Sequence, residues 1–253
     1  MDYNKNEGKF NWELLFCEMY AGGKYDNGGD NYEFSLGLNG LGLCATQYAS
    51  EYMDAEIKSG GYKYTLHFEH GENVGGLVKE EYKKRGDTGT RIKWKPDLKV
   101  FTDINIPVEY FEETIKRQAI VNDGIKFVFK NQISSASFDT KEYCYENGIQ
   151  DYVKDIAGDK AFTTPQYWEC ERVGKDREDL NEYKLKIKAS LCFSLDTQLK
   201  EYYHNSSFLE HGGAPEKAFK SAFVSQINAY LKANNKYNLS LIHISEPTRL
   251  RCI

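Results

Sequence analysis

The chain reads Ser35-Leu36-Gly37-Leu38-Asn39-Gly40-Leu41-Gly42 and then runs into the small, apolar segment Leu43–Ser50. Three glycines in eight residues let the backbone adopt positive φ angles and leave room for a close neighbour. The segment that follows is predicted to be helical, with the helix covering about 38–52. A helix that begins there directs unpaired N–H groups and a partial positive charge toward the glycine turn. Such a turn is typical of a phosphate-binding site.

A tight turn packed on a core has the same pattern, and a short glycine motif does not separate the two interpretations. The surroundings favour a ligand. Ala21-Gly22-Gly23-Lys24-Tyr25 precedes the turn, and Thr88-Gly89-Thr90 follows it. Between the first of these motifs and the turn, residues 24–34 form a polar loop with few apolar side chains. Such a loop opens and closes at little energetic cost, as a lid over a ligand must.

Composition restricts the class of protein. The 253 residues are 40% hydrophobic and 28% charged, which is typical of a soluble globular chain. The formal net charge of −5 excludes a chain that wraps nucleic acid as a basic whole. There is no signal peptide and no apolar run of transmembrane length, so a cytoplasmic protein without a membrane partner is expected.

The six cysteines have neither CxxC spacing nor a Cys/His spacing suited to zinc. Five of them lie in apolar or alternating segments and are expected to be buried free thiols. This usage fits a reducing compartment.

Hydrophobic periodicity predicts an α+β fold. Residues 1–8 are polar and are expected to be frayed. Amphipathic helices are predicted at about 12–19, 107–120, 149–156 and 215–233. Strands are predicted at about 62–68, 91–95, 125–129, 138–145, 166–172 and 183–193. A segment rich in Ser, Asn and Ala at 131–137 is interpreted as a domain boundary.

Several motifs in order resemble one family, the B subunits of bacterial DNA gyrase and topoisomerase IV. The glycine turn, together with residues 21–25 and Tyr32, resembles the ATP lid of that family. Thr88-Gly89-Thr90 with Trp94-Lys95-Pro96-Asp97 resembles its TGT strand and the segment after it. Residues 145–153 resemble the start of its transducer domain, and Gly212-Gly213 with the helix that follows resembles a later turn and helix of that domain.

The resemblance implies two two-layer α/β sandwich domains. Residues 1–131 would be the C-terminal half of a GHKL (Bergerat) ATPase domain, and residues 132–237 would be part of a ribosomal-S5-like transducer domain. Residues 238–253 resemble one reading frame of a transposon adapter used in sequencing libraries. This tail is therefore expected to be non-native.

The resemblance also implies an ATP site. Lys24 would approach the terminal phosphate as a point charge, Tyr32 would donate its hydroxyl to a phosphate, and Thr90 would face the adenine. The backbone N–H groups of the turn would cradle the phosphates. The full implied set is Lys24, Tyr32, Gly37, Leu38, Asn39, Gly40, Leu41, Gly42 and Thr90.

The chain departs from the family pattern in the lid, where Leu36 replaces a glycine and Asn39 replaces a histidine, and at Ala214-Pro215, which replaces a Thr-His pair. No catalytic residue and no metal ligand is assigned. The general-base glutamate and the magnesium ligand are expected upstream of residue 1, and the phosphate-sensing lysine is expected downstream of residue 237. The cofactors implied are thus ATP and Mg²⁺, with hydrolysis by this chain alone expected to be very slow.

The function implied is that of the ATP-binding part of an ATP-dependent type II DNA topoisomerase, an isomerase that couples ATP to DNA strand passage. Its partners would be ATP, DNA through the complete enzyme, a second copy of the ATPase domain and a DNA-cleaving A-type subunit. Two alternatives stay open. One is another GHKL ATPase, of the mismatch-repair or chaperone type. The other is a non-catalytic α+β interaction module in which the glycine loop is only a turn.

Overall fold

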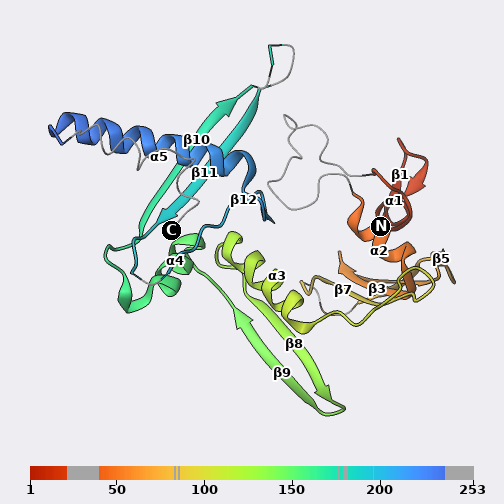
Figure 1. Cartoon of the computed structure of the whole chain (residues 1–253). Helices are drawn as coiled ribbons and strands as arrows, with labels where there is room; N and C mark the ends of the chain where they lie inside the picture. The colour runs from red at the N-terminus through yellow and green to blue at the C-terminus, as the bar shows by residue number, and fades with distance from the viewer. Residues whose placement is uncertain are drawn as a thin grey trace. The chain divides into compact units, whose positions relative to one another are not determined.

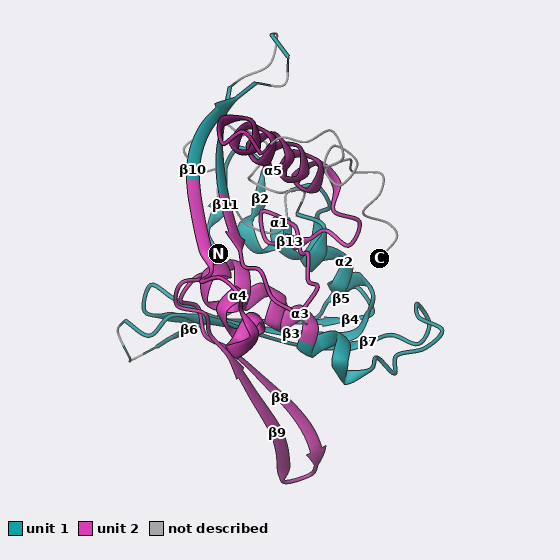
Figure 2. Ribbon diagram, turned by 60° about the vertical axis from the view of Figure 1, so that its left-hand side comes forward, with its two compact units in different colours: residues 1–112, 170–187 teal, residues 113–169, 188–253 magenta. Residues whose placement is uncertain are grey.

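The computed structural model describes residues 1–21, 40–82, 84, 86–175, 177–178, 182–195 and 197–236 (Figure 1). The chain divides into two compact units, one of residues 1–112 with 170–187 and one of residues 113–169 with 188–253 (Figure 2). The expected limits of the two domains and of the tail stay predictions.

The first unit contains a five-stranded antiparallel sheet. Its strands lie in the order β5 (Glu72–Asn73), β4 (Tyr62–Glu69), β3 (Ser50–Ser59) and β7 (Gly89–Pro96), and β6 (Val78–Glu81) also pairs with β4. Ala55 on β3 lies opposite Leu66 on β4 and opposite Ile92 on β7. The strands that side-chain alternation predicted at 62–68 and 91–95 are therefore confirmed as β4 and β7, and both belong to this sheet.

The core of this unit lies between helix α1 (Asn11–Cys17) and one face of the sheet. Phe16 of α1 stacks on Phe68 with ring centroids 5.4 Å apart. The buried cluster is completed by Met53, Ala55 and Leu66. The predicted helix at 12–19 is confirmed up to Cys17, and Trp12 and Phe16 of its apolar stripe pack on the sheet in a two-layer α/β arrangement. Leu15 is exposed, and Met19 lies beyond the end of the helix and is exposed too, so this part of the predicted stripe is wrong.

The predicted helix at 38–52 is wrong in its last part. Helix α2 covers Gly42–Tyr48, and β3 begins at Ser50. Met53 and Ala55 are buried on one face of β3. Two-residue alternation and pairing with strands on both sides therefore override the small-residue helical pattern that precedes them.

The N-terminus is also more ordered than expected. Strands β1 (Tyr3–Asn4) and β2 (Lys9–Phe10) form a short hairpin instead of a frayed end. The Asn4 carboxamide oxygen accepts hydrogen bonds from the N–H groups of Asn6 and Glu7, at 3.0 and 3.3 Å. The rings of Tyr3 and Phe10 meet edge to face with centroids 5.2 Å apart. Local turn bonds therefore stabilise a segment whose composition is polar.

The rest of the chain alternates hairpins and helices. Helix α3 (Val108–Val121) begins after Pro107, as predicted, and spans the division between the units. The predicted helices α4 (Ile149–Ala157) and α5 (Gly213–Ala233) are confirmed, and a short 3-10 turn, η1 (Gly158–Lys160), follows α4. The hairpins are β8 (Phe127–Ser134) with β9 (Ser137–Tyr143), β10 (Gln166–Gly174) with β11 (Tyr183–Leu191), and β12 (Tyr203–His204) with β13 (Ser207–Phe208).

The Ser- and Asn-rich segment at 131–137 lies within a hairpin. β8 continues to Ser134, and Asn131 pairs with Asp139 of β9. The predicted end of the strand at Phe129 is therefore wrong. The polar residues occupy the exposed tip of a long hairpin, where alternation of apolar side chains is not required.

All five cysteines in the described part of the chain are free, but only Cys44 is buried. Cys17, Cys170 and Cys192 are partly exposed and Cys144 is exposed, so burial was over-predicted. Among the described helices, none is long and apolar enough to span a membrane.

Candidate functional site

Four residues of the predicted ATP site fall in the described part of the chain: Gly40, Leu41, Gly42 and Thr90. All four belong to the first compact unit. The other predicted site residues lie outside the described residues; they are Lys24, Tyr32, Gly37, Leu38 and Asn39. The geometry that follows therefore concerns the end of the glycine turn and the TGT strand.

The glycine turn leads into α2 in the geometry that an anion site requires. Gly40 has a φ of +64°, and Leu41 caps the helix with a φ of −86°. The first bond of the helix runs from the N–H of Ala45 to the carbonyl oxygen of Leu41, at 2.8 Å. The N–H groups of Gly42, Leu43 and Cys44 therefore precede the helical ladder and point out of its N-terminal end.

The described residues leave space beside this turn. A Cβ atom built on Gly42 meets none of their heavy atoms within 4 Å. Gly42 and Gly40 are both exposed, so a phosphate can approach their backbone. Backbone N–H donors and an unobstructed approach together fit the phosphate chain of a nucleotide.

Asp97 holds the other end of α2. Its N–H donates to the carbonyl oxygen of Ala49, at 3.0 Å, at the residue that caps α2. Its buried carboxylate accepts the N–H of Lys99 at 2.8 Å and lies 2.7 Å from Nδ1 of His70. The Lys99 N–H, with help from His70, holds the pKa of Asp97 below its usual range. Asp97 thus ties α2 to the ends of β4 and β7.

In the sequence analysis, Asp97 appeared only as part of a family motif, and its partner His70 was not identified. A signal for Asp97 is present, because a Pro-Asp pair directly after an alternating strand is typical of a turn that the aspartate stabilises. No sequence signal indicates His70, which lies 27 residues away along the chain.

Thr90 is placed on β7 opposite Ile57 of β3. Since side chains alternate along a strand, Thr90 shares the sheet face of Met53 and Ala55, the face that α1 covers. Its own side chain is exposed, because β7 forms one edge of the described sheet. The hydroxyl is therefore available to a ligand from the same side of the sheet as the core.

The opposite face of the sheet carries a separate polar cluster. His67 lies between two carboxylates, with Nδ1 2.6 Å from Asp54 and Nε2 3.1 Å from Glu69. Hydrogen bonds to these two groups raise the pKa of His67. This cluster faces away from Thr90 and does not contribute to the candidate site.

The described donors at the glycine turn suit an anion and not a metal ion. No group of three or more His, Cys, Asp or Glu side chains able to hold a metal ion occurs in the described part of the chain. The donors at the glycine turn are N–H groups, which bind anions and not cations. No step that uses Mg²⁺ is therefore assigned to these residues.

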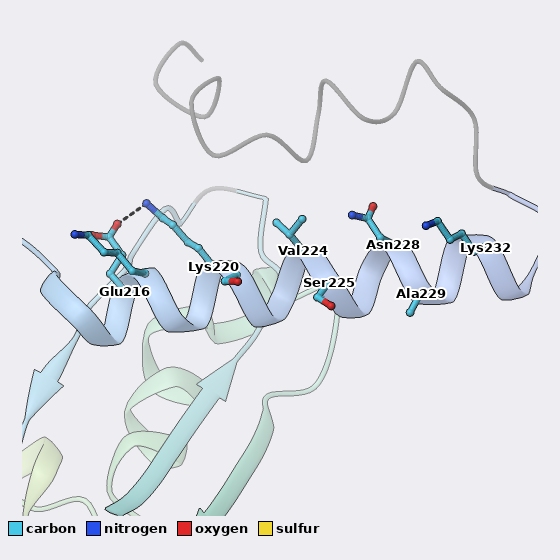
Figure 3. Close-up of a pocket in the computed structure, with 9 residues that line it drawn as sticks. Glu216, Lys220, Val224, Ser225, Asn228, Ala229 and Lys232 are labelled. Atoms are coloured by element: carbon cyan, nitrogen blue, oxygen red, sulfur yellow. Dashed lines mark ion pairs between the residues drawn. The ribbon is translucent and has the colours of Figure 1, made fainter. Parts of the chain in front are cut away.

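A hollow runs along α5 in the second unit (Figure 3). The described residues that line it lie along α5, and two of them, Glu216 and Lys220, form an ion pair of 2.5 Å. Val224, Asn228 and Lys232 continue the same face. None of the predicted nucleotide residues lines it, so the hollow supplies no argument for an ATP site.

Comparison with known proteins agrees with the fold and with the motifs. A family model described as DNA gyrase B matches residues 148–246, a range that extends beyond the predicted tail limit at 237. The B subunit of DNA topoisomerase 4 from Escherichia coli (strain K12) is 30% identical over 61% of this chain and 24% of that protein. The B subunit of DNA gyrase from Chlamydia pneumoniae is 30% identical over 88% of this chain and 27% of that protein. The chain thus spans about a quarter of the length of these curated relatives.

The solved structures show the fold. The crystal structure of the 43K ATPase domain of Thermus thermophilus gyrase B, in complex with an aminocoumarin, aligns with a TM-score of 0.67 and 20% identity. The alignment covers 94% of this chain and 57% of that one. The predicted α+β fold of the GHKL ATPase type is therefore confirmed. By sequence and by fold, the chain is similar to the B subunits of DNA gyrase and topoisomerase IV.

Proposed function

We propose that this chain is the ATP-binding part of an ATP-dependent type II DNA topoisomerase. The observation that carries the proposal is the glycine turn at Gly40–Gly42, which opens directly onto the unpaired N–H groups of α2. The chain is similar to the B subunits of topoisomerase 4 and gyrase. In an ATP-dependent enzyme of this kind, the N–H groups at the turn would bind the phosphates of ATP.

The proposed binding mode follows from the chemistry of each group. The N–H groups of Gly42, Leu43 and Cys44 donate to phosphate oxygens, as do those of the preceding turn. Lys24 adds a positive charge and Tyr32 a hydroxyl donor. Thr90 contacts the adenine with its hydroxyl. Preorganised donors of this kind favour a bound triphosphate and the charge that develops when it is hydrolysed.

Hydrolysis and DNA strand passage are proposed for the complete subunit. That subunit would supply the general base and the ligand for Mg²⁺, pair with a second copy of its ATPase domain, and act with a DNA-cleaving A-type subunit. ATP and Mg²⁺ are the proposed cofactors.

The test is nucleotide binding by the chain, measured by calorimetric titration with a non-hydrolysable ATP analogue. Gly42→Ala is the informative variant, because the added Cβ meets no atom of the described residues but enters the space proposed for phosphate. Binding should be lost while the circular dichroism spectrum stays unchanged. Ala45→Ser is the control, since Ala45 is exposed on α2 beyond the free N–H groups.

A second pair of variants tests the lysine. Lys24→Ala should weaken binding at least about tenfold, a loss of about 1.4 kcal/mol. Lys5→Ala, which removes an exposed lysine elsewhere, should have no effect. If neither the chain nor a version extended upstream binds the analogue, the proposal fails and an interaction module becomes the better interpretation.

A further inference from the structure

Gly148 leads from β9 into helix α4 in a conformation and surroundings that require glycine. Its φ is +54°, a backbone conformation that residues with a side chain rarely adopt. A Cβ atom built on Gly148 would overlap the carboxylate of Asp123, which forms an ion pair with Lys188. A larger residue at this position would therefore disturb the start of α4.

Asn147 precedes this glycine and is bonded to the first turn of α4. Its backbone N–H donates to Oδ2 of Asp151 at 2.8 Å. Its side-chain amide donates to Oδ1 and Oδ2 of the same carboxylate, at 3.2 and 3.0 Å. Asn147 is exposed, so water reaches it. These bonds hold the chain before α4 against the helix.

An asparagine that precedes a glycine is prone to lose its amide nitrogen. The backbone nitrogen of the second residue attacks Cγ of the asparagine, and glycine has no side chain to obstruct this attack. The sequence contains three such pairs, Asn27-Gly28, Asn39-Gly40 and Asn147-Gly148. The third pair lies wholly in the described part of the chain, where the fold requires its glycine.

We propose that Asn147 is a site of spontaneous deamidation and that the hydrogen bonds at the start of α4 set its rate. In the folded chain the N–H of Gly148 donates to the carbonyl oxygen of Tyr145, at 3.1 Å. The amide of Asn147 is held by Asp151. Both sets of bonds oppose the approach of the Gly148 nitrogen to Cγ of Asn147. The reaction therefore proceeds when the first turn of α4 opens locally.

The reaction needs only water and a base. The base takes the proton of the Gly148 N–H, and the nitrogen bonds to Cγ of Asn147. The bond between Cγ and Nδ2 then breaks, and the nitrogen leaves as ammonia after it takes a proton from the solvent. Water opens the resulting cyclic imide at either carbonyl carbon. One product is aspartate, and the other is isoaspartate, whose main chain runs through the side-chain carbon atoms.

Both products weaken the contact with α4. Aspartate at residue 147 places a second carboxylate beside Asp151 and removes the amide donors. Isoaspartate lengthens the main chain by one carbon, which shifts the N–H of residue 147 relative to the helix. The ring of Tyr152 on α4 meets that of Tyr145 edge to face, with centroids 5.7 Å apart. Deamidation should loosen this contact and speed up hydrogen exchange in the first turn of α4.

The experiment follows the loss of the amide in the full 253-residue chain. One sample is aged folded in mildly alkaline buffer and another is aged unfolded in urea. Trypsin then releases residue 147 in the peptide 142–154, and mass spectrometry measures conversion of the amide to the acid. We expect conversion in both samples, with a slower rate in the folded chain. A protease that cleaves before aspartate and not before isoaspartate should reveal both products.

Matched variants test the role of Asp151. Asp151→Ala removes the acceptor of the Asn147 bonds and should raise the rate in the folded chain about tenfold, as expected for loss of a hydrogen bond to a charged group. It should leave the rate in urea unchanged. Asp155→Ala, at an exposed carboxylate on the same helix, should have no effect in either sample. If Asp151→Ala does not fold by circular dichroism, Asp151→Asn, which keeps one acceptor oxygen, should give a smaller increase.

Asn147→Gln tests the consequence, because its longer side chain closes the imide ring far more slowly. After ageing, hydrogen exchange at residues 149–152 should be faster in the parent chain than in this variant, and equal exchange would overturn the proposed effect on α4. The modification site itself is overturned if Asn147 keeps its amide in urea or if aspartate is the only product. The control by α4 is overturned if the folded chain converts as fast as the unfolded one, or if the folded Asp151 variant converts at the rate of the parent.

Discussion

At the scale of single residues, Gln47 is the least expected feature of the molecule. It is fully buried on α2, and both atoms of its amide lack a hydrogen-bond partner among the described residues. An unsatisfied buried polar group costs about 1–3 kcal/mol. Gln47→Met, which keeps the shape and removes the polar atoms, should therefore raise the free energy of unfolding by up to about that amount.

Urea denaturation measures this change, and Gln150→Met on the exposed side of α4 is the matched control, expected to lie within about 0.5 kcal/mol of the parent chain. A loss of stability in the Gln47 variant would mean that the amide has a partner in the folded chain. Gln47 lies on the helix that follows the glycine turn, so such a result would assign it a role in positioning the candidate site.

The lowered pKa of Asp97 leads us to expect that the stability of the chain depends on pH. The pKa of the Asp97 carboxyl is lower in the folded chain than its ordinary value of 3.8. The ionised carboxylate therefore stabilises the folded chain at pH values above 3.8. This stabilisation is lost as the pH falls from 3.8 through the pKa of the folded state. The chain should therefore lose stability below about pH 4. Asp97→Asn should show a flatter profile in this range and a lower stability at pH 7.

Thermal unfolding followed from about pH 7 to about pH 2.5 checks this prediction, because the range spans the ordinary pKa of an aspartate. Asp103→Asn is the control, since the Asp103 carboxylate is exposed and bonds to its close neighbour Asn105. If the Asp97→Asn variant loses stability at low pH in the same way as the parent chain, the Asp97 carboxylate does not stabilise the contact between α2 and the strands.

At the scale of elements, the predictions from sequence succeeded where one period persisted. Helices α3, α4 and α5 were found because apolar residues recur at helical spacing over several turns. The shorter α1 was found as well, but its predicted stripe was too long, since the helix ends at Cys17. The boundary between α2 and β3 was misplaced, because the small, apolar segment at 43–50 gives no information on where strand pairing begins. Register with β4 and β7 decides that boundary, and it depends on residues far along the chain.

The hairpin of β12 and β13 illustrates an element held by polar contacts. Glu201 accepts the hydroxyls of Tyr203, at 2.9 Å, and Tyr152, at 3.3 Å. The side-chain amide of Gln118 on α3 donates to the carbonyl oxygen of Ser206 at 2.9 Å. Burial, and then Glu201, raises the pKa of both tyrosines well above the usual range.

Tyr203→Phe should therefore lower the free energy of unfolding by about 1.5 kcal/mol, because it removes a bond to a charged, partly buried carboxylate. Hydrogen exchange of residues 203–208 should accelerate. The control is Tyr167→Phe, which removes a 2.7 Å bond to Glu169 on an exposed strand and should have little effect. Equal effects of the two variants would mean that burial of Glu201 does not strengthen its bonds.

At the scale of the whole molecule, the sequence indicated candidate motifs more clearly than it indicated how the fold would place them. Gly42 and Thr90 lie far apart along the chain and reach one compact unit only because β3 lies between their elements in the fold. No periodicity encodes that placement. The expectation that the two motifs share one site came from the family resemblance. The residues alone indicated only a glycine turn and a strand. The same limit applies to the His70–Asp97 tie, which no local pattern indicates.

The placement predicts how a ligand should act on the two units. An ATP analogue bound at the glycine turn should slow hydrogen exchange at Gly42, Leu43 and Cys44, whose N–H groups it would engage. Exchange along α5, which belongs to the other unit and contains the hollow, should not change. A ligand at about 100 times its Kd stabilises the state that binds it by about 2.7 kcal/mol, so the protection should be easy to detect. Gly42→Ala should abolish it. Protection confined to α5 would instead locate the ligand in the hollow and contradict the proposed site, whereas protection at α2 that survives Gly42→Ala would show that the nucleotide approaches the helix from another side.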